Sequence, residues 1–81
     1  MEKWWVYILR CEDGSFYTGT ALDVQKRFLL HKAGKGAKYT RSHKPVAVVF
    51  SEEHPSRAAA CVREAAIKKL SRQEKESLSS A

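Results

Sequence analysis

The sequence has 81 residues, and its fifteen Lys and Arg against nine Asp and Glu give a formal net charge of +6. This length predicts one domain over residues 1–81, with a core at about 4–76, and a chain of this size buries only about 60% of its unfolded surface. No apolar run approaches the roughly 20 residues that span a bilayer, so we expect no membrane partner. The basic balance favours a polyanion as partner, and nucleic acid is the commonest polyanion.

The cysteine content and the start of the chain indicate the compartment. Cys11 and Cys61 are too few for a disulfide framework. Met1-Glu2-Lys3 runs straight into strand-like sequence and lacks the pattern of a signal peptide. We therefore expect a cytoplasmic protein with free thiols, and we take it to be a monomer.

The first predicted elements are two short strands joined by a tight turn. Residues 4–9 form an apolar and aromatic run that is too short for a helix and rich in strand formers. Glu12-Asp13-Gly14 is a hairpin signal, and residues 16–20 form the return strand. Each strand carries one tyrosine, Tyr7 in the first and Tyr17 in the second.

The length of the hairpin loop decides whether the two tyrosines share a face of the sheet. A two-residue loop at 13–14 would place Tyr7 and Tyr17 on opposite faces, because side chains alternate along a strand. A three-residue loop with Gly14 in the left-handed conformation would pair Tyr7 with Gly19 and bring both phenols to one face. If the tyrosines act together, the three-residue loop or another odd offset is required.

The middle of the chain predicts a helix, a loop and a third strand. Asp23 is a good N-cap for a helix from residue 24 to about residue 32, which two glycines end. Residues 33–44 are predicted to form a loop. The β-branched run at 46–50 reads as the third strand.

The last third of the chain is predicted to be mostly helical. Residues 51–55 read as a turn, and Ser56 is a plausible N-cap for an alanine-rich helix over 57–70 whose buried face the sequence leaves open. Residues 71–74 form a capping box that starts a short last helix, and residues 77–81 are expected to fray. The order β-β-α-β-α-α predicts an α+β fold with a three-stranded, mostly antiparallel sheet and flanking helices.

Hydrolysis of a phosphodiester gives these elements a possible chemistry. The attacking water needs a proton acceptor, the phosphate needs a cation, and a metal ion can stabilise the leaving oxygen. Tyr7 and Tyr17 are candidates for handling the proton, although a phenol with a pKa of about 10 becomes a base only near a cation or metal. On spacing alone, two tyrosines that merely pack in the strands are the more common case.

Three helix residues complete the candidate site, and each also has a simpler interpretation. The planar guanidinium of Arg27 suits a phosphate, but it could be a solvated helix arginine. His31 lies one turn further and could contact a phosphate or a phenol, or lie at the surface. Glu64 could bind Mg²⁺ or form an i,i+4 ion pair with Lys68.

The predicted loop at 33–44 is a candidate nucleic-acid surface. It carries four Lys and Arg, no acid and one aromatic residue, a combination in which cations contact phosphates and a ring stacks on a base. The residues that would form this surface are Lys35, Lys38, Tyr39, Arg41 and Lys44. The sequence has no CxxC or HxxxH pairing for zinc, no Walker or Rossmann glycine motif and no nucleophile elbow.

Together these residues resemble the GIY-YIG nuclease domain family over about residues 4–76. The segments that carry the resemblance are Trp5-Val6-Tyr7, Tyr17-Thr18-Gly19, Asp23-Val24-Gln25-Lys26-Arg27, His31 and Glu64. The chain is most similar to the small stand-alone bacterial (YhbQ-like) branch. Its Gly-Lys-Gly-Ala-Lys-Tyr-Thr-Arg and Ile-Lys-Lys-Leu-Ser-Arg stretches stand here at residues 34–41 and 67–72.

The resemblance implies an endonuclease that depends on one Mg²⁺ or Mn²⁺ ion. It implies that Tyr7 is the general base for the attacking water and that Tyr17 supports Tyr7 or the phosphate. It implies that Arg27 neutralises the scissile phosphate and that Glu64 holds the metal ion. His31 is implied to assist proton transfer or to contact the phosphate.

The leading hypothesis is therefore a metal-dependent endonuclease that hydrolyses DNA, with a role in repair or recombination. Thr20 stands where some branches of the family carry Lys, which shifts the activation of Tyr7 toward His31. The alternative hypothesis is a nucleic-acid-binding module of the same fold, with weak or no catalysis and with RNA as a further substrate class. A purely structural role would leave the five candidate site residues unexplained.

Overall fold

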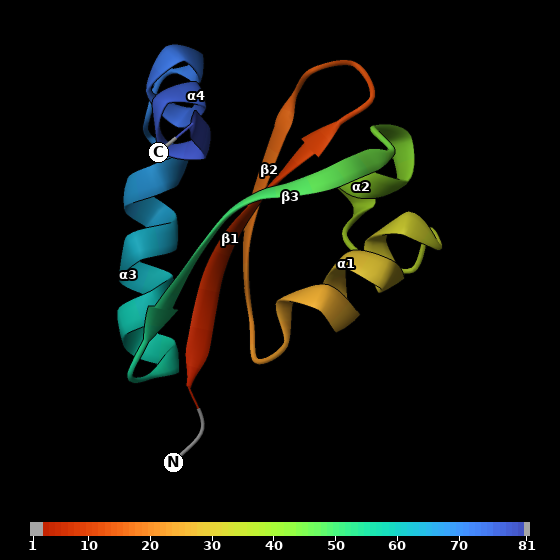
Figure 1. The fold of residues 1–81 in the computed structure, drawn as a ribbon. Coiled ribbons are helices and arrows are strands. Elements are labelled where there is room, and N and C mark those ends of the chain that lie inside the picture. The colour runs from red at the N-terminus through yellow and green to blue at the C-terminus, as the bar shows by residue number, and fades with distance from the viewer. Residues whose placement is uncertain (1–2, 81) are drawn as a thin grey trace.

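The structure is a computed structural model that describes residues 3–80. Its elements in chain order are β1 (Trp4–Cys11), β2 (Phe16–Ala21), α1 (Val24–Lys32), α2 (Lys38–Ser42), β3 (Pro45–His54), α3 (Arg57–Lys68) and α4 (Arg72–Ser80). Figure 1 shows α3 on one side of the sheet and α1 with α2 on the other. The predicted α+β fold is confirmed, with α2 as an added short helix. No helix in the described part of the chain has the length and apolar character needed to cross a membrane.

The sheet is fully antiparallel, and β1 is its central strand. The strand order is β2-β1-β3. Because β1 is covered on both faces, its successive side chains enter two different cores. Val6 and Ile8 pack against Ile67 of α3, whereas Tyr7 and Leu9 belong to the cluster that faces α1. The odd-numbered face therefore carries Tyr7 toward the helix that holds the predicted arginine and histidine.

Of the two loop lengths that the sequence left open, the hairpin has the three-residue loop that joint action of the tyrosines requires. The N–H of Gly14 donates to the carbonyl oxygen of Cys11 at 2.9 Å, and the φ angle of Gly14 is 83°, in the left-handed region that favours glycine. Tyr7 pairs with Gly19. Tyr7 and Tyr17 consequently share one face of the sheet, and this prediction is confirmed.

Strand β3 is longer than the sequence predicts. Residues 51–55 were expected to form a turn, but the strand continues to His54 and stays paired with β1. Its charged side chains find partners beside the sheet edge: one oxygen of Glu52 lies 3.0 Å from Nε of Arg63 and 2.8 Å from Nε2 of His54. An edge strand tolerates such charges, so polar composition alone was a misleading turn signal.

Helix α2 lies within the segment that was expected to be a loop. It covers five residues and follows Ala37, whose carbonyl oxygen accepts hydrogen bonds from the N–H of Arg41 at 3.3 Å and from the hydroxyl of Thr40 at 2.9 Å. The Thr40 side chain is buried against α1. A helix this short has no apolar periodicity to reveal it, so its formation depends on this tertiary contact.

The predicted N-caps of the long helices are confirmed, but two ends differ. Oδ1 of Asp23 accepts from the N–H of Lys26 at 3.0 Å, and Oγ of Ser56 accepts from the N–H of Ala59 at 3.1 Å. Helix α3 ends at Lys68 rather than at residue 70. Helix α4 continues through residues 77–80, where fraying was expected, and residue 81 lies outside the described residues.

The C-terminal half contains the predicted capping box, and its long helix α3 has a defined buried face. The capping box is present, because Ser71 N–H donates to Glu74 at 3.1 Å and Ser71 Oγ accepts from the Glu74 N–H at 3.2 Å. The buried face of α3, which the sequence left open, is marked by Ala60 and Ile67. Glu64 lies between them along the helix and is partly exposed.

Candidate active site

Tyr7, Tyr17 and His31 meet on the face of the sheet that α1 covers. The hydroxyl of Tyr7 lies 2.9 Å from Nε2 of His31, and both residues are only 2% exposed. The ring centroid of Tyr17 lies 6.4 Å from that of Tyr7 and 5.1 Å from that of His31. Three of the five predicted catalytic residues therefore form one cluster, built by two strands and one helix.

Gly19 makes this cluster possible. A Cβ atom at this position would lie 2.7 Å from the hydroxyl oxygen of Tyr7 and 3.1 Å from Cε2 of Tyr17. Real Cβ atoms do not approach heavy atoms as closely as the first of these distances. The glycine of the Tyr17-Thr18-Gly19 motif is therefore needed for space rather than for backbone flexibility.

His31 is buried, so its interpretation as a surface histidine is wrong. Its Nδ1 lies 2.6 Å from Oγ1 of Thr40 in α2. Gly36 lies directly against the imidazole, because a Cβ atom there would overlap the ring. Thr40 and Gly36 were not among the predicted site residues. The glycine-rich stretch that resembles the family was the one available signal, but it indicated only a helix end and a nucleic-acid surface.

The electrostatic setting keeps the phenol of Tyr7 neutral. Burial raises the pKa of Tyr7 strongly, the neighbouring Tyr17 raises it further, the charge of Arg27 opposes this, and Glu64 raises it again. Arg27 is exposed on α1 and Glu64 arises from α3. The charges of Arg27 and Glu64 both act on the pKa of Tyr7, although neither side chain has a direct contact with the cluster among those the structure describes.

Glu64 is the candidate metal ligand, and its carboxylate also has a protein partner. Oε2 lies 3.2 Å from Nζ of Lys68, and the Glu64 side chain is 22% exposed. No group of three or more His, Cys, Asp and Glu within residues 3–80 could hold a metal ion. A single carboxylate suits Mg²⁺, because this ion keeps several waters and shares oxygens of the substrate phosphate. It suits less well an ion that is held in an all-protein cage.

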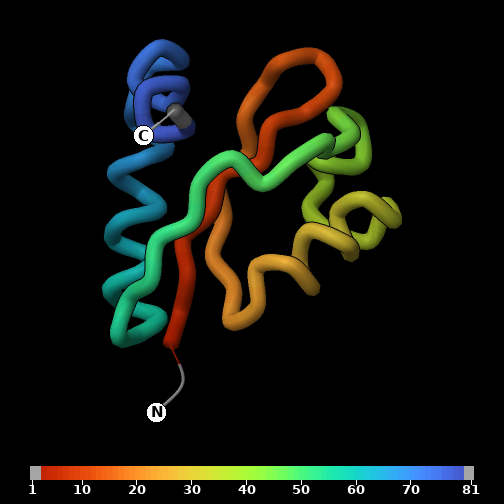
Figure 2. Tube along the Cα trace, viewed as in Figure 1, coloured from red at the N-terminus to blue at the C-terminus, as the bar shows by residue number. Residues whose placement is uncertain are grey.

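The predicted nucleic-acid surface faces solvent beside the phenols. Its members, all exposed, are Lys35, Lys38, Tyr39, Arg41 and Lys44. The Tyr39 ring lies 6.0 Å from the Tyr17 ring and stacks on His43 at 4.1 Å between centroids. The hairpin loop holds this segment in place, since the N–H of Glu12 donates to the carbonyl oxygen of Lys44 at 2.9 Å (Figure 2).

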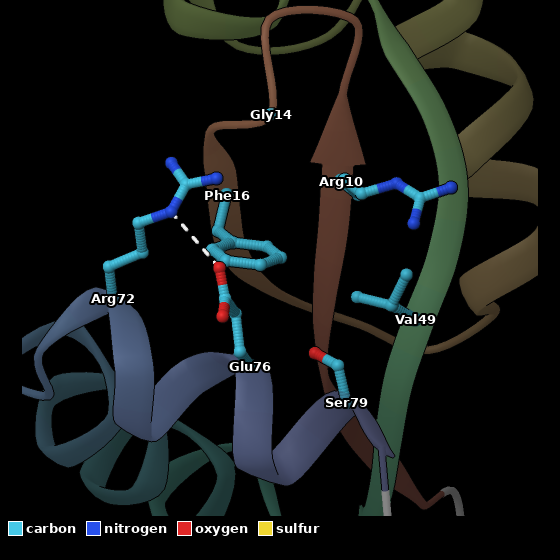
Figure 3. Close-up of a pocket in the computed structure, with 7 residues that line it drawn as sticks. All are labelled: Arg10, Gly14, Phe16, Val49, Arg72, Glu76 and Ser79. Carbon is cyan, nitrogen blue, oxygen red and sulfur yellow. Dashed lines mark hydrogen bonds and ion pairs between the residues drawn. The ribbon is translucent and has the colours of Figure 1, made fainter.

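A hollow of about 430 Å³ lies on the other face of the sheet, between the hairpin and α4 (Figure 3). Its best-placed cation, Arg72, is engaged within the protein, since Nε lies 3.1 Å from Oε1 of Glu76 and the guanidinium lies over the Phe16 ring. Arg10 also lines this hollow. None of the five predicted catalytic residues lines it, so this hollow and the candidate chemistry are separate.

The burial of His31 predicts a loss of stability in mild acid. Burial, and then the charge of Arg27, hold the pKa of His31 below its ordinary value of 6.5. His31 of the unfolded chain therefore binds a proton near pH 6.5, whereas His31 of the folded protein resists it. Stability that is present above this pH is consequently lost as the pH drops toward the pKa of His31 in the folded protein. Urea midpoints at about pH 7.5 and about pH 5.5 measure this loss.

The matched control for this acid effect is the other histidine of the same region. His31→Gln should lose less stability between the two pH values than the wild type does. His43→Gln should follow the wild type, because it leaves His31 buried. An equal acid loss in the wild type and His31→Gln would show that other groups cause it.

The α+β fold carries two paired phenols, an arginine and a histidine on one helix, and a glutamate on a second helix. This combination defines a class of catalytic domain. The chain belongs to the GIY-YIG catalytic domain family, whose model matches residues 3–77. This membership supports a nuclease-type function and nucleic-acid binding, and nucleases of the family typically use divalent metal ions.

Small proteins of similar length match almost the whole chain. A UPF0213 protein of Streptococcus sanguinis is 55% identical over 74 residues, which are 91% of this chain and 85% of that protein. The NMR structure of the UPF0213 protein BH0048 from Bacillus halodurans is 47% identical, covers 96% of this chain and 83% of its own, and has a TM-score of 0.59. The NMR structure of EF2693 from E. faecalis is 42% identical, with coverages of 95% and 82% and a TM-score of 0.63.

Proposed function

We propose that this protein is a divalent-metal-dependent endonuclease that hydrolyses phosphodiester bonds of DNA. The observation that carries the proposal is the 2.9 Å contact between the Tyr7 hydroxyl and Nε2 of His31 inside a buried cluster. A general base must lie within hydrogen-bond reach of the proton it receives, and this pair meets that requirement for transfer from phenol to imidazole. The family membership supplies the reaction class.

Tyr7 and His31 handle the proton of the attacking water. Both are neutral at rest, because the pKa of Tyr7 is raised and that of His31 is lowered. The proton therefore moves in step with the attack: water gives its proton to the Tyr7 oxygen while the phenol proton passes to Nε2 of His31. The water oxygen bonds to phosphorus, the bond to the leaving oxygen breaks, and the leaving oxygen takes a proton from solvent. His31 returns the Tyr7 proton to water after the product leaves.

Arg27 and Glu64 act on the negative charge of the scissile phosphate and its leaving oxygen. The guanidinium of Arg27 neutralises the phosphate, for which its planar fork of donors is suited. Glu64 would hold one Mg²⁺ or Mn²⁺ ion, and that ion would supply stabilisation of the negative charge on the leaving oxygen. Tyr17 lies beside both Tyr7 and His31 and orients the phosphate or the water through its hydroxyl.

The exposed cations beside the phenols bind the DNA backbone. Lys35, Lys38, Arg41 and Lys44 flank Tyr39 in the sequence and are exposed, and the 33–44 segment contains no acid. This surface adjoins Tyr17, so a strand bound there passes the catalytic cluster. Such phosphate contacts make affinity depend on salt.

Glu64 and Lys68 form a matched pair for testing the metal site. Glu64→Gln should raise the Mg²⁺ concentration for half-maximal cleavage by about tenfold, which corresponds to about 1.4 kcal/mol. Lys68→Gln removes the same ion pair but keeps the carboxylate, so its Mg²⁺ requirement should stay at or below that of the wild type. If both variants lose only the ~0.3–0.5 kcal/mol of stability typical of an i,i+4 pair and cleave normally, Glu64 is a surface partner and no metal ligand.

The cleavage panel for this test contains single-stranded, duplex, flapped and branched DNA, and one RNA. Cleavage of DNA that depends on metal and on Arg27 supports the proposal. Equal cleavage by the wild type and Arg27→Ala would identify a contaminating nuclease. Binding without cleavage under Mg²⁺ and Mn²⁺ would instead favour the binding-module alternative, which the basic surface also supports.

A further inference from the structure

The hydroxyl of Thr40 has one proton, and the structure indicates where that proton goes. Oγ1 of Thr40 lies 2.9 Å from the carbonyl oxygen of Ala37. In this contact the hydroxyl is the donor, because a carbonyl oxygen can only accept. Toward its other partner, Nδ1 of His31 at 2.6 Å, Thr40 must therefore act as the acceptor.

A proton on Nδ1 decides the state of the other ring nitrogen. A neutral imidazole carries one N–H, so Nε2 of His31 has a free lone pair. That lone pair faces the hydroxyl of Tyr7 at 2.9 Å, which makes Tyr7 the donor. The hydrogen bonds then run in one direction, from Tyr7 through His31 and Thr40 to the carbonyl of Ala37.

We propose that Thr40 is a positioning residue that holds His31 in the tautomer protonated at Nδ1 and so keeps Nε2 ready to receive the Tyr7 proton. Thr40 is 1% exposed, and its position in α2 is fixed by the short helix that begins after Ala37. The neighbouring side chains of α2 point outward, since Lys38, Tyr39 and Arg41 are exposed. One five-residue helix thus supplies both the acceptor that orients the base and cations that contact the substrate.

The catalytic consequence rests on the proposed nuclease function, but the tautomer does not. Without an acceptor at position 40, Nδ1–H is left unpartnered in a buried site. The imidazole then gains by moving its proton to Nε2 and donating to the Tyr7 oxygen. In that state His31 cannot accept the phenol proton, so cleavage slows although both side chains remain in place.

The first measurement is the tautomer itself, from ¹⁵N chemical shifts of the imidazole nitrogens in long-range ¹H–¹⁵N spectra of the intact protein. The His31 signals are assigned by their absence from His31→Gln. We expect the wild type and Thr40→Ser to show the Nδ1–H form and Thr40→Val, which keeps the shape but lacks the acceptor, to lose it. A wild-type signal with the proton on Nε2, or an unchanged Nδ1–H form in Thr40→Val, overturns the proposal.

The second measurement is the cleavage rate of the same proteins. Thr40→Val should slow cleavage on the order of tenfold to a hundredfold, and Thr40→Ser should restore it, while the affinity for DNA stays the same in both. A fully active Thr40→Val with the altered tautomer would remove the catalytic consequence. If no protein cleaves any substrate, the proposed function fails while the spectra still decide the tautomer. If Thr40→Val does not fold, the wild type and Thr40→Ser spectra decide it.

Discussion

Tyr7→Phe should slow DNA cleavage by about 10²–10⁴-fold while leaving the affinity for DNA and its salt dependence unchanged, because general-base catalysis contributes rate in this range. The variant removes one hydroxyl and keeps the ring that packs with Leu9 and Ala21. It also leaves Nε2 of His31 buried without its partner, which should cost about 1–3 kcal/mol of folding free energy. Single-turnover cleavage and urea unfolding measure the two effects separately.

Thr18→Val is the matched control for the loss of a buried hydroxyl. Thr18 lies next to Tyr17 on the same strand but faces the other core, and its Oγ1 is buried without a hydrogen-bond partner within the described residues. Its removal should therefore leave cleavage unchanged and keep or raise stability, since replacing an unsatisfied buried polar group with a methyl group removes a desolvation cost. Normal cleavage by Tyr7→Phe would eliminate the phenol as the base and transfer that role to His31.

The part of the site that lies in the hairpin could be predicted because strand geometry leaves few choices. Side chains alternate along a strand, so an odd offset is the only way to bring Tyr7 and Tyr17 to one face. Gly14 supplied the turn signal, and its positive φ in the structure matches it. Local rules of this kind depend on neighbours in the chain, and the sequence contains those neighbours.

The environment of His31 could not be predicted, because it depends on a fold-back of the chain. In its helix the sequence shows an apolar pair one turn apart, Val24 and Phe28, and these residues pack beside Tyr7. The burial of His31 comes from Thr40, nine residues away, in a helix too short to show a pattern. A lysine- and glycine-rich segment has the composition of an exposed loop, and composition carries no information on one inward-facing threonine.

The two glycines after α1 are a second case in which the sequence does not reveal the structural role of a residue. They also lead to the second prediction of a large loss of cleavage. The sequence indicated that both end the helix, but only Gly34 has a positive φ, at 77°. Gly36 is required for a different reason, because a side chain there would enter the imidazole ring of His31. Gly34 is required for its backbone conformation, and Gly36 is required for the space that it leaves free. The sequence alone does not distinguish these two requirements.

Gly36→Ala should therefore displace His31 and reduce cleavage by about 10²–10⁴-fold, the same range as the loss of Tyr7's hydroxyl. Overpacking of a buried group typically costs about 1–3 kcal/mol, so the free energy of unfolding should fall as well. The altered position of the ring can be followed by the ¹⁵N shifts of His31 and by urea unfolding of the same samples.

Gly34→Ala is the control, since a Cβ atom there meets nothing within 4 Å while the positive φ imposes backbone strain of about 1–2 kcal/mol. The two variants should thus be destabilised to a similar degree, but only Gly36→Ala should lose cleavage and change the His31 signals. Equal loss of cleavage in both would mean that the segment contributes general stability. Full activity in Gly36→Ala would mean that the position of the His31 ring does not limit the reaction, and the Tyr7–His31 proton transfer would have to be abandoned.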